Sequence, residues 1–241
     1  MSQIINTDNL PKHIAITMDG NGRWARSKGK LRVVGHKNGV TAVRDTVEAA
    51  AEMGIKFLTL YAFSNENWNR PKSEVNALMG LLVSAINKET KTLMDNNIKL
   101  STIGATDNLP SKAKKELLEA MKKTKNNTRM TLILALSYSG KWDILQAIKG
   151  LTADQIKPDE INEHIFQQYL STRNVPNPEL LIRTSGEYRI SNFLLWQIAY
   201  SELYFTNTLW PDFRRIDLEK AVLDYQNRER RFGKTTEQIQ I

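Results

Sequence analysis

HIAITMDGNGRWA, residues 13–25, joins a short apolar run to a glycine-rich turn that carries an aspartate and an arginine. The run from His13 to Met18 predicts a strand, and the glycines after it permit a tight turn and close approach of the backbone to a ligand. Amides at the start of the helix that follows can bind phosphate oxygens. The stretch therefore predicts a strand, an anion-binding turn and a helix.

The same alternation continues through the rest of the chain. Apolar residues recur at helical spacing from Val40 to Met53, and Gly54 ends that helix. We predict further strands at residues 57–63, 98–103, 130–136 and 180–182, and helices at 71–96, 111–125, 142–151, 160–170, 191–199 and 217–232. Strands separated by helices predict an α/β fold with a mostly parallel central sheet flanked by helices, where ligands bind beyond the carboxyl ends of the strands.

Length and composition limit the class of protein. The chain of 241 residues, 41% of them hydrophobic, is expected to form a single domain, with residues 1–11 as a flexible N-terminal extension. It has no cysteine and three histidines, which argues against disulfides and zinc clusters. We see no signal-peptide pattern and no apolar run that would span a bilayer, so we expect a cytoplasmic protein. The net charge of +8 favours an anionic partner, such as nucleic acid, a phosphorylated metabolite or an acidic membrane surface.

Two more predicted strands end in polar loops. Residues 64–71 read SNENWNRP and residues 183–192 read RTSGEYRISN, so hydroxyl, amide and guanidinium groups follow each strand. Each loop also has a plainer explanation: Asp19 as a helix cap, Trp68 as packing, and the arginines as ion-pair partners of Glu187. Three such loops at one edge of a sheet favour a diphosphate site. A carboxylate at Asp19 fits beside phosphates if Mg²⁺ bridges them.

Two nucleotide-binding classes fit less well. The turn matches G-x-G-x-x-A, which is typical of dinucleotide-binding proteins, but these carry an acidic residue about twenty positions later at the end of the second strand. Here that strand ends near Phe63, well beyond this spacing. The phosphate-binding motif G-x-x-x-x-G-K-[ST] does not occur in the sequence.

Four segments together resemble the undecaprenyl diphosphate synthases, the bacterial cis-prenyltransferases. They are IAITMDGNGRWA, GHKNG, LYAFSNENWNRP and LLIRTSGEYRISNFLLWQIAYSELYFTNTLWPDF, and the resemblance runs in consistent order from about residue 12 to Gly233. It implies an Mg²⁺-dependent enzyme that condenses isopentenyl diphosphate with farnesyl diphosphate, forming cis double bonds. The implied product is undecaprenyl diphosphate, the lipid carrier for cell-wall polysaccharide synthesis, made beside an apolar tunnel. A cis-prenyltransferase of different product length stays open.

The resemblance also implies roles for individual residues. Asp19 is implied in catalysis and, with Glu202 acting from the partner subunit's side, in Mg²⁺ binding. Asn67 matches a position often assigned to proton removal, but a neutral amide is a poor base, so we expect it to orient diphosphate, water or substrate. The residues that match substrate-binding positions are Gly20, Asn21, Gly22, Arg23, Trp24, Arg32, His36, Ser64, Asn65, Glu66, Trp68, Arg70, Arg183, Arg189, Ile190 and Ser191.

The resemblance implies partners as well. Trp210, Phe213 and residues 228–233 match a part associated with dimer contacts, so we expect a homodimer, in transient contact with the inner face of the membrane for product release. The apolar residues of helix 71–96 line the tunnel or belong to the core. Trans-type prenyl synthases carry paired aspartates, which are absent from the sequence. Asp19, Arg23 and Arg189 argue against a non-catalytic regulatory subunit, and we expect no nucleic-acid binding despite the charge.

Overall fold

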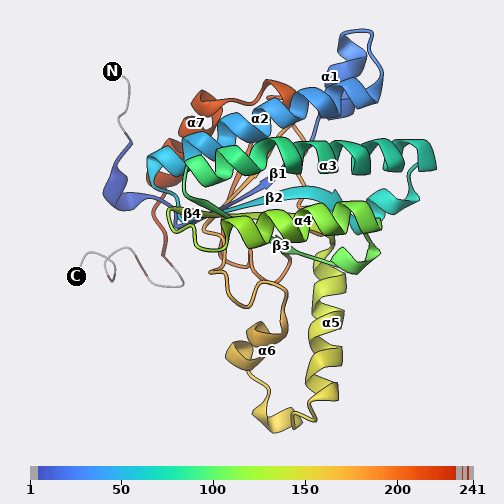
Figure 1. The fold of residues 1–241 in the computed structure, drawn as a ribbon. Helices are drawn as coiled ribbons and strands as arrows, with labels where there is room; N and C mark the ends of the chain where they lie inside the picture. Colours follow the sequence, from blue (N-terminus) through green and yellow to red (C-terminus); the bar gives the residue numbers. More distant parts are fainter. Residues whose placement is uncertain (1–4, 232–234, 236–237, 239–241) are drawn as a thin grey trace.

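A parallel sheet forms the centre of the molecule (Figure 1). The computed structural model describes residues 5–231, 235 and 238. Within these residues the sheet has six strands in the order β3-β4-β2-β1-β5-β6, and every adjacent pair is parallel. The strands are β1 (His13–Thr17), β2 (Phe57–Ser64), β3 (Ile98–Ile103), β4 (Met130–Tyr138), β5 (Leu180–Arg183) and β6 (Glu202–Phe205). The predicted fold class is confirmed, and β6 is a strand that the sequence did not predict.

Helices cover one face of this sheet. The α-helices of the described chain are α1 (Asn21–Ser27), α2 (Arg32–Met53), α3 (Lys72–Asp95), α4 (Ser111–Thr124), α5 (Gly140–Ala153), α6 (Glu163–Tyr169) and α7 (Arg215–Gln226). Apolar residues of α2, α3, α4 and α7 share one core with β1 and β2, and Figure 1 shows α2, α3 and α4 side by side in front of the strands. Gly54 ends α2 in the left-handed conformation, as its position in the sequence predicted.

The other face is covered largely by an irregular segment. The predicted helix at 191–199 is wrong, because Ser191, Asn192 and Leu194 have positive φ angles and the segment forms turns. Asn192 explains the difference: its backbone oxygen accepts from the Gly140 amide and its side chain accepts from the Lys141 amide. These tertiary hydrogen bonds replace helical ones and leave apolar side chains such as Phe193 and Leu194 buried against the sheet.

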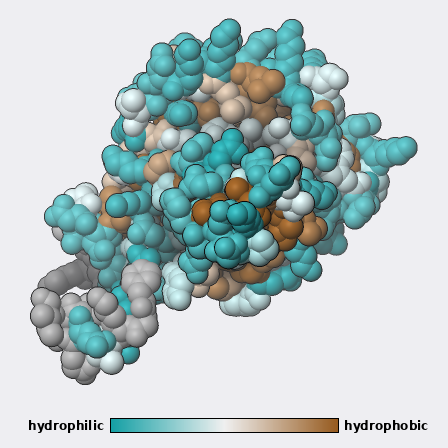
Figure 2. All heavy atoms as spheres, turned by 90° about the horizontal axis from the view of Figure 1, so that it is seen from below, coloured by the Kyte–Doolittle hydropathy of each residue, from teal (hydrophilic) through white to brown (hydrophobic). Residues whose placement is uncertain are grey.

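Helices α5 and α6 form an arm that extends from the body (Figure 1). Ala147 and Leu151 of α5 pack against Phe166 of α6 and Leu170 in a small core of their own. The arm lies lowest in Figure 1 and therefore nearest the viewer in Figure 2, where hydrophobic atoms gather near the middle of a mostly hydrophilic face. Leu145, Ile148 and Ile161 are exposed hydrophobic residues of this region.

The ends of the described chain pack together. Thr7–Asn9 form a short 3₁₀ helix, and the Gln226 side chain donates to the backbone oxygens of Asn6 and Asn9. Residues 5–11 of the expected flexible extension are thus attached to α7, and residues 1–4 lie outside the described residues. The helix predicted at 217–232 ends at Gln226, and residues 232 and 233 also lie outside the described part. Among the described residues, no helix combines the length and apolar character needed to cross a membrane.

Candidate active site

The three polar loops meet at one edge of the sheet. Strands β2, β1 and β5 are neighbours, and Thr17 at the end of β1 pairs with Arg183 at the end of β5. Because all three strands are parallel, the loops that follow them leave on the same side. The sheet order therefore confirms the predicted convergence of three loops at the carboxyl ends of the strands, namely residues 19–25, 64–71 and 183–192.

Asp19 is fixed through both its backbone and its carboxylate. Its amide donates to the Thr184 hydroxyl at 2.9 Å, and its carbonyl oxygen accepts from the Trp210 amide at 3.0 Å. One carboxylate oxygen accepts from the Gly20 amide at 2.7 Å and the other from the Arg183 guanidinium at 2.9 Å. The side chain is 34% exposed, so the carboxylate stays accessible. The N-cap of α1 is Gly20, which rules out the plainer explanation of Asp19 as a helix cap.

Gly20 makes the turn possible. Its φ of +108° belongs to the region that favours glycine, and a Cβ atom there would lie 3.0 Å from both a Leu209 methyl and the Ser185 Cβ. The turn brings Asn21 and Gly22 beside Asp19 at the mouth of a cavity. Because α1 has only seven residues, its N-terminus is a weak anion site, and the cationic side chains around the turn are the groups suited to hold an anion.

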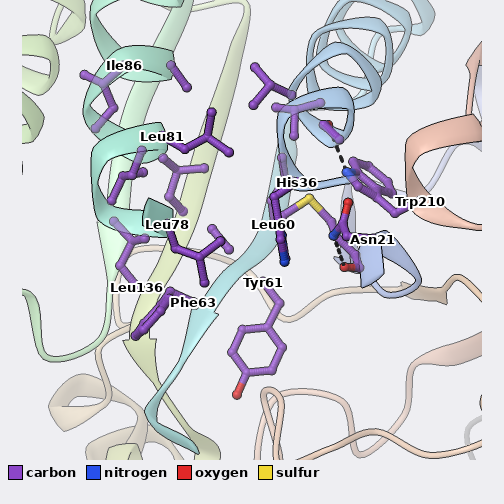
Figure 3. A pocket seen from close by; sticks show the side chains of 18 of the residues that line it. Asn21, His36, Leu60, Tyr61, Phe63, Leu78, Leu81, Ile86, Leu136 and Trp210 are labelled. Atoms are coloured by element: carbon purple, nitrogen blue, oxygen red, sulfur yellow. Dashed lines mark hydrogen bonds between the residues drawn. The ribbon is translucent and has the colours of Figure 1, made fainter. Parts of the chain in front are cut away.

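The cavity lies between α2, α3 and the sheet, with a volume of about 290 Å³ (Figure 3). Its mouth carries the polar residues Asp19, Gly20, Asn21, Gly22, Arg32, His36, Asn67 and Arg70. Its walls are apolar: Figure 3 shows Leu78, Leu81 and Ile86 on α3 facing the cavity, with Leu136 and Phe63 below. Leu82 also lines it, and Leu78, Leu82 and Ile86 both border the cavity and pack in the core. This is the apolar tunnel that was expected.

Glu74 organises the cations at the mouth. It forms ion pairs with Arg70 at 3.1 Å and with Arg32 at 3.5 Å, and it is 17% exposed. Burial, together with the charge of Arg70, lowers the pKa of His36 to about 4, so the imidazole is neutral at pH 7. Sequence reasoning missed Glu74, although a carboxylate four residues after Arg70, in the first turn of α3, was a usable signal.

Arg183 lies inside the protein rather than at its surface. It is 3% exposed, and its guanidinium donates to Asp19, to the Arg189 carbonyl at 2.6 Å and to the Ser191 hydroxyl at 2.7 Å. It therefore holds the β5 loop against the β1 turn. The plainer explanation, ion pairs with Glu187, also applies to this loop: Glu187 pairs with Arg189 and, at 3.2 Å, with Arg23. Arg189 is the most accessible of these cations, with 59% of its side chain exposed.

The loop after β2 is held by polar contacts to distant segments. The Ser64 backbone amide donates to the side-chain oxygen of Asn67 at 3.1 Å, which leaves the side-chain NH₂ of Asn67 as a donor. This arrangement agrees with an orienting role for Asn67. Asn65 accepts from Ser137, and the Trp68 indole donates to the same hydroxyl, each at 2.9 Å. Sequence reasoning missed Ser137.

Glu66 connects the loop after β2 to the loop after β5. Its carboxylate accepts from Asn192 at 2.9 Å. Burial opposes the charge on Glu66, but the hydrogen bond from Asn192 and other polar contacts prevail and lower its pKa. Asn192 thus joins two of the three loops, a role that sequence reasoning did not assign.

Several predicted residues pack elsewhere in this chain. Trp24 is 7% exposed and its indole donates to Asp212 at 2.7 Å, while Ile190 packs against the core on the second face of the sheet. Trp210 and Phe213 are at most 2% exposed, so they belong to the interior of the chain and present no surface to a second copy. Trp210 lines the cavity and donates to the Gly39 carbonyl (Figure 3).

The two residues predicted to bind metal do not meet within one chain. Glu202 begins β6 and pairs with Leu180, three residues before the pair formed by Arg183 and Phe205. It therefore lies roughly 10 Å along the strand from the level of Arg183. Its carboxylate forms an ion pair with Arg228 at 2.8 Å. Among the described residues, no group of three or more His, Cys, Asp or Glu is arranged to hold a metal ion.

One ion pair interrupts the apolar wall of the cavity. Arg44 of α2 and Glu89 of α3 both border the cavity, and the Arg44 Nε donates to Glu89 at 2.8 Å while a second guanidinium nitrogen contacts the other carboxylate oxygen. The two side chains are 39% and 16% exposed. This bidentate pair joins the two helices that enclose the cavity.

Together the fold and the site define a transferase of amphiphilic diphosphates, because cations and a carboxylate surround the mouth of an apolar cavity. The chain belongs to the undecaprenyl diphosphate synthase family, whose family model matches residues 17–233. It is 55% identical to an isoprenyl transferase of Chlorobaculum tepidum over 95% of this chain and 88% of that protein. It is also 55% identical to a farnesyl-diphosphate-specific ditrans,polycis-undecaprenyl-diphosphate synthase of Pasteurella multocida, over 95% and 97% of the two chains.

A solved structure agrees with this assignment. Lavandulyl diphosphate synthase from Lavandula x intermedia, in complex with dimethylallyl diphosphate, superposes with a TM-score of 0.90 and 38% sequence identity. The match covers 93% of this chain and 99% of the plant protein. The fold of the chain is therefore that of a prenyl diphosphate enzyme.

Proposed function

We propose that this chain catalyses the sequential cis-condensation of isopentenyl diphosphate with farnesyl diphosphate to form undecaprenyl diphosphate, the lipid carrier for cell-wall polysaccharide synthesis. One observation carries the proposal: the cationic mouth around Asp19 opens directly into the apolar cavity between α2 and α3. A prenyl diphosphate has the same division, with a charged head and an apolar tail. The farnesyl-diphosphate-specific relative of Pasteurella multocida supports the choice of substrate.

Arg32, Arg70 and His36 are proposed to bind the diphosphate of the allylic substrate. The guanidinium groups offer paired donors to phosphate oxygens, and both arginines line the mouth. Neutral His36 contributes a ring N–H donor without competing charge. The apolar tail then extends along Leu78, Leu82 and the strand side chains, where water is excluded.

Asp19 is proposed to hold Mg²⁺ together with the substrate phosphates. Its carboxylate is accessible, and each oxygen accepts one hydrogen bond from the protein, which leaves lone pairs free. One carboxylate plus phosphate and water oxygens is a common ligand set for Mg²⁺. When bound, the ion supplies stabilisation of the negative charge that develops on the departing diphosphate. Glu202 of the same chain lies too far along the sheet to complete this set.

The second substrate is proposed to bind beside the loop after β5. Arg189 is exposed there, while Arg183 fixes Ser191 and the Arg189 backbone from below. The double bond of isopentenyl diphosphate attacks the first carbon of the allylic chain, and the diphosphate leaves with the bonding electrons. A proton is then lost to a diphosphate oxygen. The free amino group of Asn67 orients the reactants from the loop after β2.

The active form is proposed to be a homodimer in the cytoplasm, in transient contact with the inner face of the membrane. Support for dimerisation comes from exposed apolar residues, namely Leu145 and Ile148 of α5, Ile161 just before α6, and Tyr188 and Tyr200. A second copy could also bring its Glu202 towards Asp19, which one chain does not do.

The test is a condensation assay with purified protein, farnesyl diphosphate, labelled isopentenyl diphosphate and Mg²⁺, followed by sizing of the lipid products. We expect products that reach the undecaprenyl length, and loss of turnover when a chelator removes Mg²⁺. Products of another length would assign the chain to a different cis-prenyltransferase. Absence of any elongation would refute the proposed function.

A further inference from the structure

The connection between α1 and α2 concentrates positive charge. We name residues 26–37 the α1–α2 tip, and it contains Arg26, Lys28, Lys30, Arg32 and Lys37, all of them exposed. No acidic residue occurs from residue 20 to residue 44. The +8 charge of the chain is therefore unevenly distributed, with one uniformly cationic segment next to the mouth of the cavity.

Most of these charges have no acidic partner in the part of the chain that the structure describes. Among the residues that the structure describes, Arg32 pairs with Glu74 at 3.5 Å, but Arg26, Lys28, Lys30 and Lys37 form no ion pair. The Lys28 ammonium lies 5.0 Å from the centre of the Trp24 ring and keeps its charge at the surface. On α4, Lys115 pairs with Glu119, whereas Lys122 and Lys123 near the end of that helix form no ion pair among the described residues, which makes them a suitable comparison for the tip.

Two apolar side chains project from the same tip. Leu31 is 78% exposed, the largest exposed fraction among the exposed large hydrophobic residues of the described chain, and Val33 is 44% exposed. Leaving a leucine or valine in water forgoes about 1.5–3 kcal/mol of burial free energy. Exposed aliphatic residues between lysines are typical of segments that bind at the boundary between lipid headgroups and acyl chains.

The tip is continuous with the cavity mouth. Arg32 and His36, in the first turns of α2, line the mouth, and the Arg32 guanidinium lies within 3.4 Å of the position that a Gly22 Cβ would take. Figure 1 shows α1 and its connection to α2 projecting at the upper right, at the end towards which the β1 and β2 arrows point. A surface that contacts the tip therefore also faces the opening of the cavity.

We propose that the α1–α2 tip docks on the surface of an anionic lipid bilayer. Lysine and arginine contact the lipid headgroups, and Leu31 and Val33 enter the interface. This inference rests on the proposed function, since docking there places the cavity mouth at the membrane and lets a long apolar product leave without crossing water. A bilayer fits better than a nucleic acid, because exposed Leu31 and Val33 gain nothing from a phosphate backbone.

Vesicle co-sedimentation of the full chain tests the proposal. Vesicles of phosphatidylcholine alone are compared with vesicles in which phosphatidylglycerol replaces part of it. We expect binding to the second kind, weakened by salt, and weakened further in the triple variant Lys28→Ser/Lys30→Ser/Leu31→Ser. The loss of two lysines corresponds to roughly 30-fold weaker partitioning, at about fivefold for each charge. The matched control on α4, Leu118→Ser/Lys122→Ser/Lys123→Ser, should bind as the wild type does.

Three results would overturn the proposal: equal binding of the triple variant and the wild type, release of the wild type from vesicles by inorganic pyrophosphate, or full binding by Leu31→Ser alone. Release by pyrophosphate would assign the cations to the substrate site. Full binding by Leu31→Ser would mean that only charge attracts the tip, as it would attract any polyanion, such as DNA. In a condensation assay without vesicles the triple variant should match the wild type, because none of its three residues lines the cavity. If the proposed catalysis is wrong, the wild type will show no activity in that assay, and the vesicle experiment will still test the docking of the tip.

Discussion

Arg183 donates to the Asp19 carboxylate at 2.9 Å from a position that is only 3% exposed. The accessible carboxylate of the β1 turn thus rests on a buried cation from β5. Because of this hydrogen bond, Asp19 has a structural role in addition to its proposed role in catalysis. Substitutions at this position should therefore affect both turnover and stability.

Asp19→Asn should distinguish the catalytic role of Asp19 from its structural role. The amide keeps the size of the side chain but loses the charge that Mg²⁺ requires, so we expect turnover to fall by about two to three orders of magnitude. Loss of a charged hydrogen-bond partner for Arg183 should lower the free energy of unfolding by about 1–3 kcal/mol. Steady-state assays and urea denaturation measure the two effects. Turnover near that of the wild type would remove Asp19 from the mechanism.

Gly20→Ala should destabilise the turn after β1. The new Cβ would meet Leu209 and Ser185 at 3.0 Å in a left-handed backbone conformation, so we expect a loss of about 2 kcal/mol or more in urea denaturation. Gly80→Ala in α3 is the matched control, because no atom lies within 4 Å of its added Cβ. That change should stabilise the helix by about 0.5–1 kcal/mol. Equal effects at the two sites would contradict the assigned geometry.

Ala85→Phe should shorten the lipid product. Ala85 lies on α3 and borders the cavity, so the larger ring would fill space that a growing chain is proposed to use. The first condensations should proceed at the wild-type rate, and the product distribution should move to shorter chains in a sizing assay. Its neighbour Ser84 is exposed and does not border the cavity, which makes Ser84→Phe the control. Unchanged product length in Ala85→Phe would mean that the chain grows elsewhere.

His13 should make the fold sensitive to acid. Burial lowers its pKa from 6.5 to about 4, since the ring is 1% exposed between Pro176 and Thr59. Between these values the unfolded chain binds a proton that the folded chain does not, so stability is full above pH 6.5 and falls as the pH approaches 4. The loss is about 3 kcal/mol. Urea denaturation at several pH values in this range should show that the free energy of unfolding changes less with pH in His13→Gln than in the wild type. The same pH dependence in both proteins would exclude His13 as the cause.

His36 should report binding of a diphosphate. Its pKa is about 4 in the free protein because of burial and the nearby Arg70 charge. A bound anion favours the imidazolium, so inorganic pyrophosphate with Mg²⁺ should raise this pKa. NMR titration of the His36 ring protons measures the change. No shift of the midpoint on binding would place the diphosphate away from the mouth.

The periodic parts of the fold were predictable from sequence, and the contacts across it were less so. Strands such as 98–103, with apolar side chains at Ile98, Leu100 and Ile103, and helices such as 111–125 are recognisable from local sequence. Their alternation along the chain is sufficient to predict a parallel sheet. Strand β6 escaped prediction because it is four residues long and only half buried. The segment 191–199 was misjudged because Asn192 bonds to residues about fifty positions away, which local periodicity does not reveal.

The same distinction applies to the active site. The sequence pointed to Asp19, Arg70 and Arg183 because each lies at or after a strand end within a distinctive motif. Ser137 and Asn192 were missed because their importance lies in partners from other loops, such as Trp68 and Glu66. The burial of Arg183 could not be predicted either. The sequence shows that an arginine is charged, but it does not show whether its guanidinium points into the protein or into solvent.

The ion pair of Arg44 and Glu89 bears on how firmly α2 and α3 are held together beside the cavity. Burying one five-carbon unit releases about 4 kcal/mol, at roughly 0.8 kcal/mol for each carbon. A partly exposed ion pair resists with no more than about 1 kcal/mol. Burial of one unit of a growing prenyl chain therefore releases more free energy than this ion pair contributes, so the pair alone does not fix the distance between α2 and α3 at this point.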